Sequence, residues 1–120
     1  MPFDHEKLDV YRLSLDFVRL VDSFLERKGC VPRAAKDQLS RSSLSIPLNI
    51  AEGNAKWTPG ERRRFFEVAK GSAMESAAVL DVLLVTQTVP QPEVSEGKTI
   101  LLRIVSMLTR MIENEGIRLR

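Results

Sequence analysis

One segment of this sequence reads Ser45-Ile46-Pro47-Leu48-Asn49-Ile50-Ala51-Glu52-Gly53 and places a proline inside a helical apolar pattern. Pro47 removes one backbone donor, so we expect a bend there, supported by the side-chain amide of Asn49. Gly53 and Asn54 are expected to end this helix. Residues spaced by four, three and four form the narrow seam that is typical of a helix bundle; they are Leu39, Ser43, Ile46 and Ile50.

A second helix is predicted to begin directly after this segment. Thr58 can accept a hydrogen bond from the Glu61 N–H, and Pro59 suits the first helical position. Small residues midway along this helix, including Gly71, would let a neighbouring helix approach closely. We therefore expect an antiparallel helix pair. The inner face of its second member is predicted to comprise Phe65, Ala69, Ser72, Ser76, Leu80 and Leu83, widened by Phe66, Ala73 and Leu84.

Two further helices are predicted to flank this pair. The first is expected to end at Lys28 and Gly29, a cation and a glycine that suit a helix C-terminus. The last is expected to stop at Gly116. No stretch alternates as a strand would, so the sequence predicts a single all-α domain, an antiparallel up-down-up-down four-helix bundle. The helices are expected near residues 8–28, 33–53, 59–87 and 93–115.

Composition excludes several classes of function. The chain has 120 residues, 43% of them hydrophobic and 28% charged, which is typical of a soluble globular domain. No apolar run is long enough to span a bilayer, and no signal peptide is evident, so we expect no membrane partner and a cytoplasmic location. Cys30 and His5 are the single cysteine and histidine. We therefore expect no enzyme, no catalytic residue, no metal and no cofactor.

Polar residues on the two central helices are interpreted as structural. Buried polar groups need hydrogen-bond partners. We expect four residues to bond between these helices near the bend: Asn49, Glu52, Ser72 and Glu75. The alternative, a reactive role for the two carboxylates, lacks the histidines that a di-iron bundle needs.

Basic residues give the main functional signal. The net charge is +2, and residues 33–76 hold eight Lys or Arg against five Asp or Glu. A local basic patch can attract phosphate even on a nearly neutral chain. Trp57 and Tyr11 could add stacking surfaces. The candidate nucleic-acid-binding residues are Arg41, Lys56, Arg62, Arg63, Arg64 and Lys70. In the alternative interpretation, these charges merely solvate a protein-interaction scaffold.

Three runs of this sequence resemble the four-helix-bundle family named for 23S rRNA intervening sequences. They are Gln38-Leu39-Ser40-Arg41, the segment of residues 45–53, and Phe65-Phe66-Glu67-Val68-Ala69-Lys70-Gly71-Ser72-Ala73-Met74-Glu75. Leu8-Asp9-Val10-Tyr11 is also similar to the family's first helix, so the resemblance covers nearly the whole chain. Ser42-Ser43 departs from an alanine-rich pair, and Lys56-Trp57 stands where an arginine-bearing loop is common.

The resemblance implies a left-handed bundle that assembles into homo-oligomers, with pentameric rings known in the family. The chain is also similar to the accessory variability protein of diversity-generating retroelements, a pentameric bundle that binds nucleic acid through a basic surface. We therefore expect a homopentamer that binds RNA or DNA electrostatically. Wide apolar stripes on the first and last helices independently favour self-association: Leu13, Leu15 and Leu20, and Leu102, Val105 and Met107.

Overall fold

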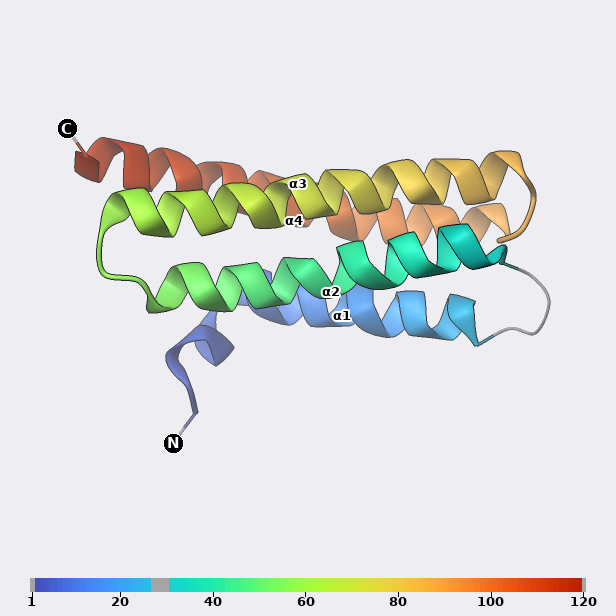
Figure 1. Ribbon diagram of the computed structural model, residues 1–120, viewed down its shortest axis with the longest axis horizontal. Coiled ribbons are helices and arrows are strands. Elements are labelled where there is room, and N and C mark those ends of the chain that lie inside the picture. Colours follow the sequence, from blue (N-terminus) through green and yellow to red (C-terminus); the bar gives the residue numbers. More distant parts are fainter. Residues whose placement is uncertain (1, 27–30, 120) are drawn as a thin grey trace.

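The computed structural model is a bundle of four long helices in which each helix runs opposite to the one before it (Figure 1). It describes residues 2–26 and 31–119, and no strand occurs within these ranges. The prediction of an all-α up-down-up-down bundle is confirmed. The elements are η1 (Asp4–Lys7), α1 (Asp9–Leu25), α2 (Arg33–Ala55), α3 (Pro59–Val85) and α4 (Gln91–Leu119).

Two predicted helix ends are wrong. Helix α2 continues through Gly53 to Ala55, and α4 continues through Gly116 to Leu119. A glycine inside a helix costs only about 1 kcal/mol relative to alanine, which packing against neighbouring helices readily offsets. By contrast, Thr58 does cap α3, because its hydroxyl accepts from the Glu61 N–H at 3.3 Å. The predicted stop at Lys28 and Gly29 lies outside the described residues.

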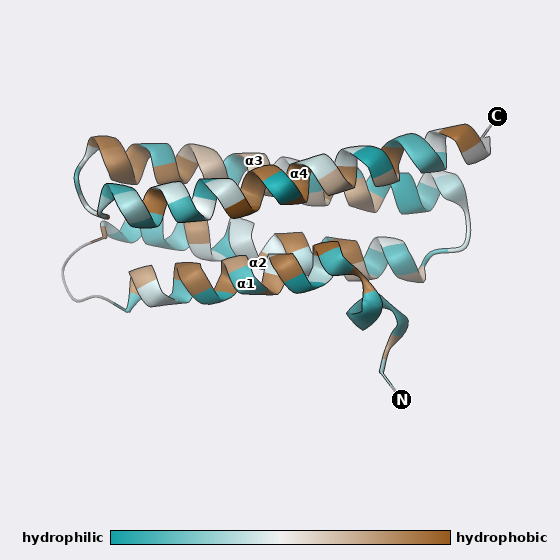
Figure 2. Ribbon diagram, turned by 180° about the vertical axis from the view of Figure 1, so that it is seen from behind, coloured by the Kyte–Doolittle hydropathy of each residue, from teal (hydrophilic) through white to brown (hydrophobic). Residues whose placement is uncertain are grey.

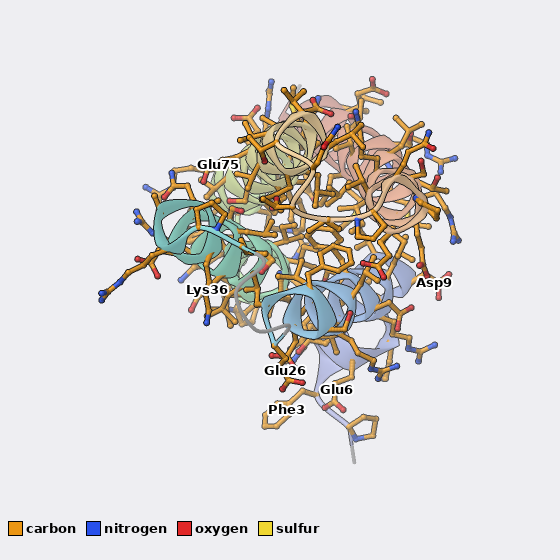
Figure 3. All side chains as sticks on the ribbon, turned by 90° about the vertical axis from the view of Figure 1, so that its right-hand side faces the viewer. Phe3, Glu6, Asp9, Glu26, Lys36 and Glu75 are labelled. Atoms are coloured by element: carbon orange, nitrogen blue, oxygen red, sulfur yellow. The ribbon has the colours of Figure 1, made fainter. Side chains whose placement is uncertain are left out.

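The core fills the space between the four helices, as the side chains in Figure 3 show. Its largest fully buried side chains include Phe17 and Phe24 of α1 and Phe66 of α3. Most of the predicted inner face of α3 is buried, including Phe66, whereas Phe65 is only half-buried and Leu84 is exposed. The predicted seam residues Leu39, Ile46 and Ile50 of α2 are fully buried, as are Ile104 and Leu108 of α4.

Helices α2 and α3 approach each other closely at Gly53. A Cβ atom at Gly53 would lie 2.7 Å from Cε1 of the buried Phe66. Gly53 is therefore needed for packing, and its interpretation as a helix end is corrected. A Cβ at Gly71 would meet nothing within 4 Å, so the interpretation of Gly71 as a site of close approach is wrong.

Helix α2 remains helical through the buried Pro47. Asn49 donates from Nδ2 to the carbonyl oxygen of Ser45 at 2.8 Å and to the Ser45 hydroxyl at 3.0 Å. Its amide therefore binds a backbone carbonyl near Pro47, but not that of Ser43, which is the carbonyl that loses its helical donor to Pro47. The bend at Pro47 itself stays a prediction.

Candidate nucleic-acid interface

Serine hydroxyls join α2 to α3 at two levels. Ser42 bonds to Ser76 with 2.7 Å between the two Oγ atoms, and Ser45 bonds to Ser72 at the same distance. Asn49 extends the second level through Ser45. We missed Ser42, Ser45 and Ser76 as bonding partners, although their spacing puts them on the facing sides of two antiparallel helices.

The predicted polar cluster is correct for only half of its members. Asn49 and Ser72 are connected through Ser45. Glu52 is exposed and pairs with Lys56 of its own helix at 3.6 Å. Glu75 lies on the outside of the bundle (Figure 3), and no group in the described part of the chain is its polar partner. The expectation that the two carboxylates bond between the helices is therefore wrong.

Replacing Asn49 with alanine should lower the free energy of unfolding by about 1 kcal/mol. The substitution removes two hydrogen bonds at a half-buried position, where water can replace them only in part. Chemical denaturation measures the change. Ser106→Ala, at an exposed position of α4, is the control and should leave the stability unchanged. Equal stability of the two variants would contradict the role assigned to Asn49.

The Arg62 side chain is held between α3, α4 and the end of α2, with 20% of its surface exposed. Its Nε donates to Oε1 of Glu115 at 2.8 Å, and its Nη1 donates to the carbonyl oxygens of Asn54 at 2.9 Å and Lys56 at 3.2 Å. The guanidinium carbon lies 5.6 Å from the ring centre of Phe66. Carbonyls at a helix C-terminus lack partners within the helix, and Arg62 supplies donors for them. This placement corrects the expectation that Arg62 belongs to the open basic surface.

Three of the remaining basic residues follow one another in the sequence where α2 ends and α3 begins. Lys56 and Arg64 both lie over the Phe65 ring, at 5.3 and 5.0 Å from its centre. Arg63 pairs with Glu67 at 3.1 Å on the exposed surface and lies beside Gly116 of α4, on another side of α3 from the Phe65 ring. Trp57, in the intervening loop, is 92% exposed. We call these four residues the turn cluster: Lys56, Trp57, Arg63 and Arg64.

Arg41 and Lys70 do not belong to the turn cluster. Arg41 precedes Lys56 by fifteen residues on α2, which places the two roughly 22 Å apart along the helix. Lys70 follows Arg64 by six residues on α3, or about 9 Å. Of the six candidates, Arg62 is the one that the structure removes from the open surface, and a role for Arg41 and Lys70 stays a prediction.

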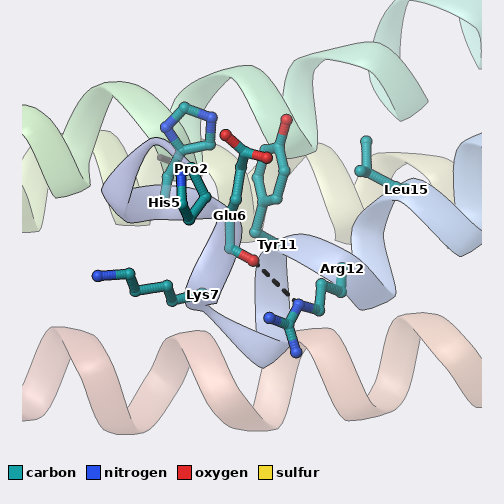
Figure 4. A pocket seen from close by; sticks show the side chains of 7 residues that line it. All are labelled: Pro2, His5, Glu6, Lys7, Tyr11, Arg12 and Leu15. Carbon is teal, nitrogen blue, oxygen red and sulfur yellow. Dashed lines mark hydrogen bonds between the residues drawn. The ribbon is translucent and has the colours of Figure 1, made fainter.

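The N-terminal segment forms a hollow of about 570 Å³ against α1 (Figure 4). Within it, the rings of His5 and Tyr11 meet edge to face with 4.7 Å between their centres. Arg12 donates from Nε to the carbonyl oxygen of Glu6 at 2.9 Å. Tyr11 is half-buried and covered by His5, so Trp57 is the more open stacking surface.

The described part of the chain offers no metal centre and no membrane helix. No group of three His, Cys, Asp or Glu side chains within it is placed to hold a metal ion. None of its helices combines the length and hydrophobicity that crossing a membrane requires.

Comparisons with known proteins identify a matching family and a solved structure with a similar fold. A family model described as 23S rRNA-intervening sequence protein matches residues 6–110. A similar crystal structure is that of a protein of unknown function from the S23 ribosomal protein family of Bacteroides thetaiotaomicron. The two are 24% identical, the match covers 86% of this chain and 97% of the other, and the TM-score is 0.79. At this identity the likeness shows the fold alone. A search of curated proteins found no match.

Proposed function

The chain belongs to the 23S rRNA-intervening sequence protein family, and from this premise we propose that it is a non-enzymatic, homo-oligomeric protein that binds RNA or DNA through its turn cluster. The observation that carries the proposal is the nearly complete exposure of Trp57 next to Lys56, which shares the Phe65 ring with Arg64. The rRNA association in the family's description favours RNA. We place this activity in the cytoplasm.

The turn cluster combines the two groups that single-stranded nucleic acid recognises. An exposed aromatic ring can stack on any base, which contributes about 1–3 kcal/mol per base. Arginine binds phosphate through two parallel hydrogen bonds, which lysine cannot do. Phosphate contacts carry no direct sequence information. We therefore propose sequence-tolerant binding.

The ion pairs already present in the turn cluster do not prevent this binding. Lys56, which follows the end of α2, pairs with Glu52, and Arg63 pairs with Glu67 of its own helix, and all four side chains are at least about one third exposed. Such pairs contribute only about 0–1 kcal/mol, so phosphate can displace them. An assembly would contain one turn cluster from each copy. The positive electrostatic potentials of these clusters would then add and attract phosphate more strongly.

Self-association is supported by apolar side chains at the surface, although not by all of those expected. Leu15 is 41% exposed and Leu102 is 69% exposed, whereas Leu13 is buried. Leu20, Val105 and Met107 are partly buried against the core. We propose a homopentamer, in which the number five comes from the family resemblance.

Replacing Lys56, Arg63 and Arg64 together with alanine should weaken nucleic-acid binding. The logarithm of the binding constant falls with the logarithm of salt by roughly 0.9 per duplex phosphate neutralised, so the slope should shrink by up to about 2.7. Titration of a fluorescent RNA and a fluorescent duplex DNA at several salt concentrations measures both effects. Arg62 is left in place because its side chain is internal.

The matched control replaces three exposed basic residues elsewhere, namely Arg19, Lys36 and Arg103. It removes the same charge, and neither triple variant should change the thermal melt. Equal losses of affinity in the two triple variants would contradict a localised site. A folded wild-type oligomer that binds neither nucleic acid at low salt would end the proposal and favour the protein-interaction scaffold.

A further inference from the structure

Helix α2 carries an outward stripe that its own bundle does not cover. Arg41, Leu44, Leu48 and Glu52 follow one another at spacings of three, four and four, so they share one face of the helix. Leu44 is 52% exposed and Leu48 is 55% exposed. No carboxylate in the described part of the chain pairs with Arg41. We call these four residues the α2 ridge.

Helices α3 and α4 form an apolar groove of about 410 Å³. Met74 and Ala77 line it from α3, and Leu102 and Val105 line it from α4. Met74 is 57% exposed and Leu102 is 69% exposed. Figure 2 shows hydrophobic residues concentrated midway along α4. We call this hollow the α3–α4 groove.

Charged residues stand at both ends of the α3 side of this groove. Lys70, Met74, Ala77 and Asp81 are spaced by four, three and four and therefore share one face of α3. Lys70 has no carboxylate partner within the described residues. Asp81 pairs with Lys98 across the groove, where both side chains are about half exposed.

The α2 ridge and the α3 side of the groove match in length and in charge. Arg41 and Glu52 are eleven residues apart, and so are Lys70 and Asp81, which gives roughly 16 Å in each case. If the two helices lie antiparallel, Arg41 meets Asp81 while Glu52 meets Lys70. The two leucines of the ridge then fall opposite Met74 and Ala77.

We propose that the α2 ridge of one copy docks into the α3–α4 groove of a second copy. This inference rests on the self-association proposed above and specifies its interface. Helix α2 packs beside α1 and α3, whereas α4 packs beside α3 and α1, so ridge and groove lie on different sides of the bundle. A contact between two different surfaces leaves a free ridge and a free groove, and its repetition can close into a ring.

Existing exposed pairs leave the charged ends available for this contact. Glu52 is bonded to Lys56, and Asp81 is bonded to Lys98, but all four side chains keep at least about a third of their surface exposed. Pairs of this kind contribute little. The leucines and Met74 supply the apolar contact, and the charges fix its direction and register.

The experiment uses one variant of each surface. Leu44→Asp/Leu48→Asp destroys the ridge, and Met74→Asp/Leu102→Asp destroys the groove. All four side chains are more than half exposed, so both variants should fold, which circular dichroism verifies. The dissociation constant of each variant alone should rise at least about thirty-fold, giving monomers in light scattering at wild-type assembly concentrations. An equimolar mixture should give a 1:1 heterodimer, because one intact ridge meets one intact groove.

A control and a charge exchange test the register. Val68→Asp, at a similarly exposed position elsewhere on α3, should assemble like the wild type. Glu52→Lys and Lys70→Glu should each weaken assembly, and their combination in one chain should restore it. A monomeric wild type at micromolar concentration would overturn the proposed self-association together with this interface. Assembly of both double variants at the wild-type mass would overturn the interface alone.

Discussion

Replacing Glu115 with alanine is expected to lower the free energy of unfolding by about 3 kcal/mol. The substitution leaves the Arg62 guanidinium without its carboxylate partner, although Nη1 still donates to two carbonyl oxygens. The Glu115 side chain is 7% exposed and that of Arg62 is 20% exposed. Water therefore compensates little for the lost pair, and the effect far exceeds that of a surface ion pair. Urea denaturation gives the free energy directly.

Glu113→Ala is the matched control for this measurement. Glu113 lies two residues earlier on α4 and is exposed, so its removal should change the stability by less than about 0.5 kcal/mol. Replacing Arg62 and Glu115 together should be less damaging than the sum of the two single changes. Strictly additive losses, or a Glu115→Ala variant as stable as the control, would show that the pair does not hold the helices together.

Replacing Gly53 with alanine is expected to destabilise the protein by about 2 kcal/mol, whereas alanine at Gly71 should stabilise it by about 0.5–1 kcal/mol. Both glycines lie inside helices, so alanine brings the same gain in helix propensity at each. At Gly53 the new methyl group would press on the Phe66 ring and on Cβ of Phe65, whereas at Gly71 it enters open space.

Thermal and chemical denaturation of the two variants should therefore give shifts of opposite sign. Each variant serves as the control for the other, because the chemical change is identical. A stabilised Gly53→Ala variant would contradict this prediction, because it would show that α2 and α3 can move apart at Gly53 without a loss of stability. A destabilised Gly71→Ala variant would show a contact at the outer surface of α3.

Apolar spacing predicted the helices well because a helix face is a local property of the chain. The start of α3 was equally predictable, since Thr58, Pro59 and Glu61 act within one turn. The end of α4 was not, because Gly116 is tolerated when the residues around it pack on other helices. Glu115, its neighbour, is bonded to Arg62 of α3, and no spacing rule within α4 contains that contact.

The candidate site was predictable in composition but not in arrangement. Three consecutive arginines lie near the start of α3, namely Arg62, Arg63 and Arg64. They differ only in the direction in which each side chain leaves the helix, so that Arg62 is partly buried and the other two are exposed. A signal for this was present: Arg62 lies one turn before Phe66, on the inner side of the helix. The predicted inner face of α3 included Phe66, but we grouped the three arginines by their adjacency in the sequence and did not compare the position of Arg62 with that face.

The order of the helices also governs how the chain reaches this structure. Only three residues separate α2 from α3, and five separate α3 from α4, so closing these loops costs little entropy. Bundles dominated by such near-neighbour contacts fold on the order of microseconds to milliseconds. Only the packing of α1 on α4 must wait until the two ends of the chain meet. The α2–α3 hairpin is held together by its serine pairs and by the bond from Arg62 to the carbonyl oxygen of Asn54. It can therefore form early in folding, and it already contains the turn cluster.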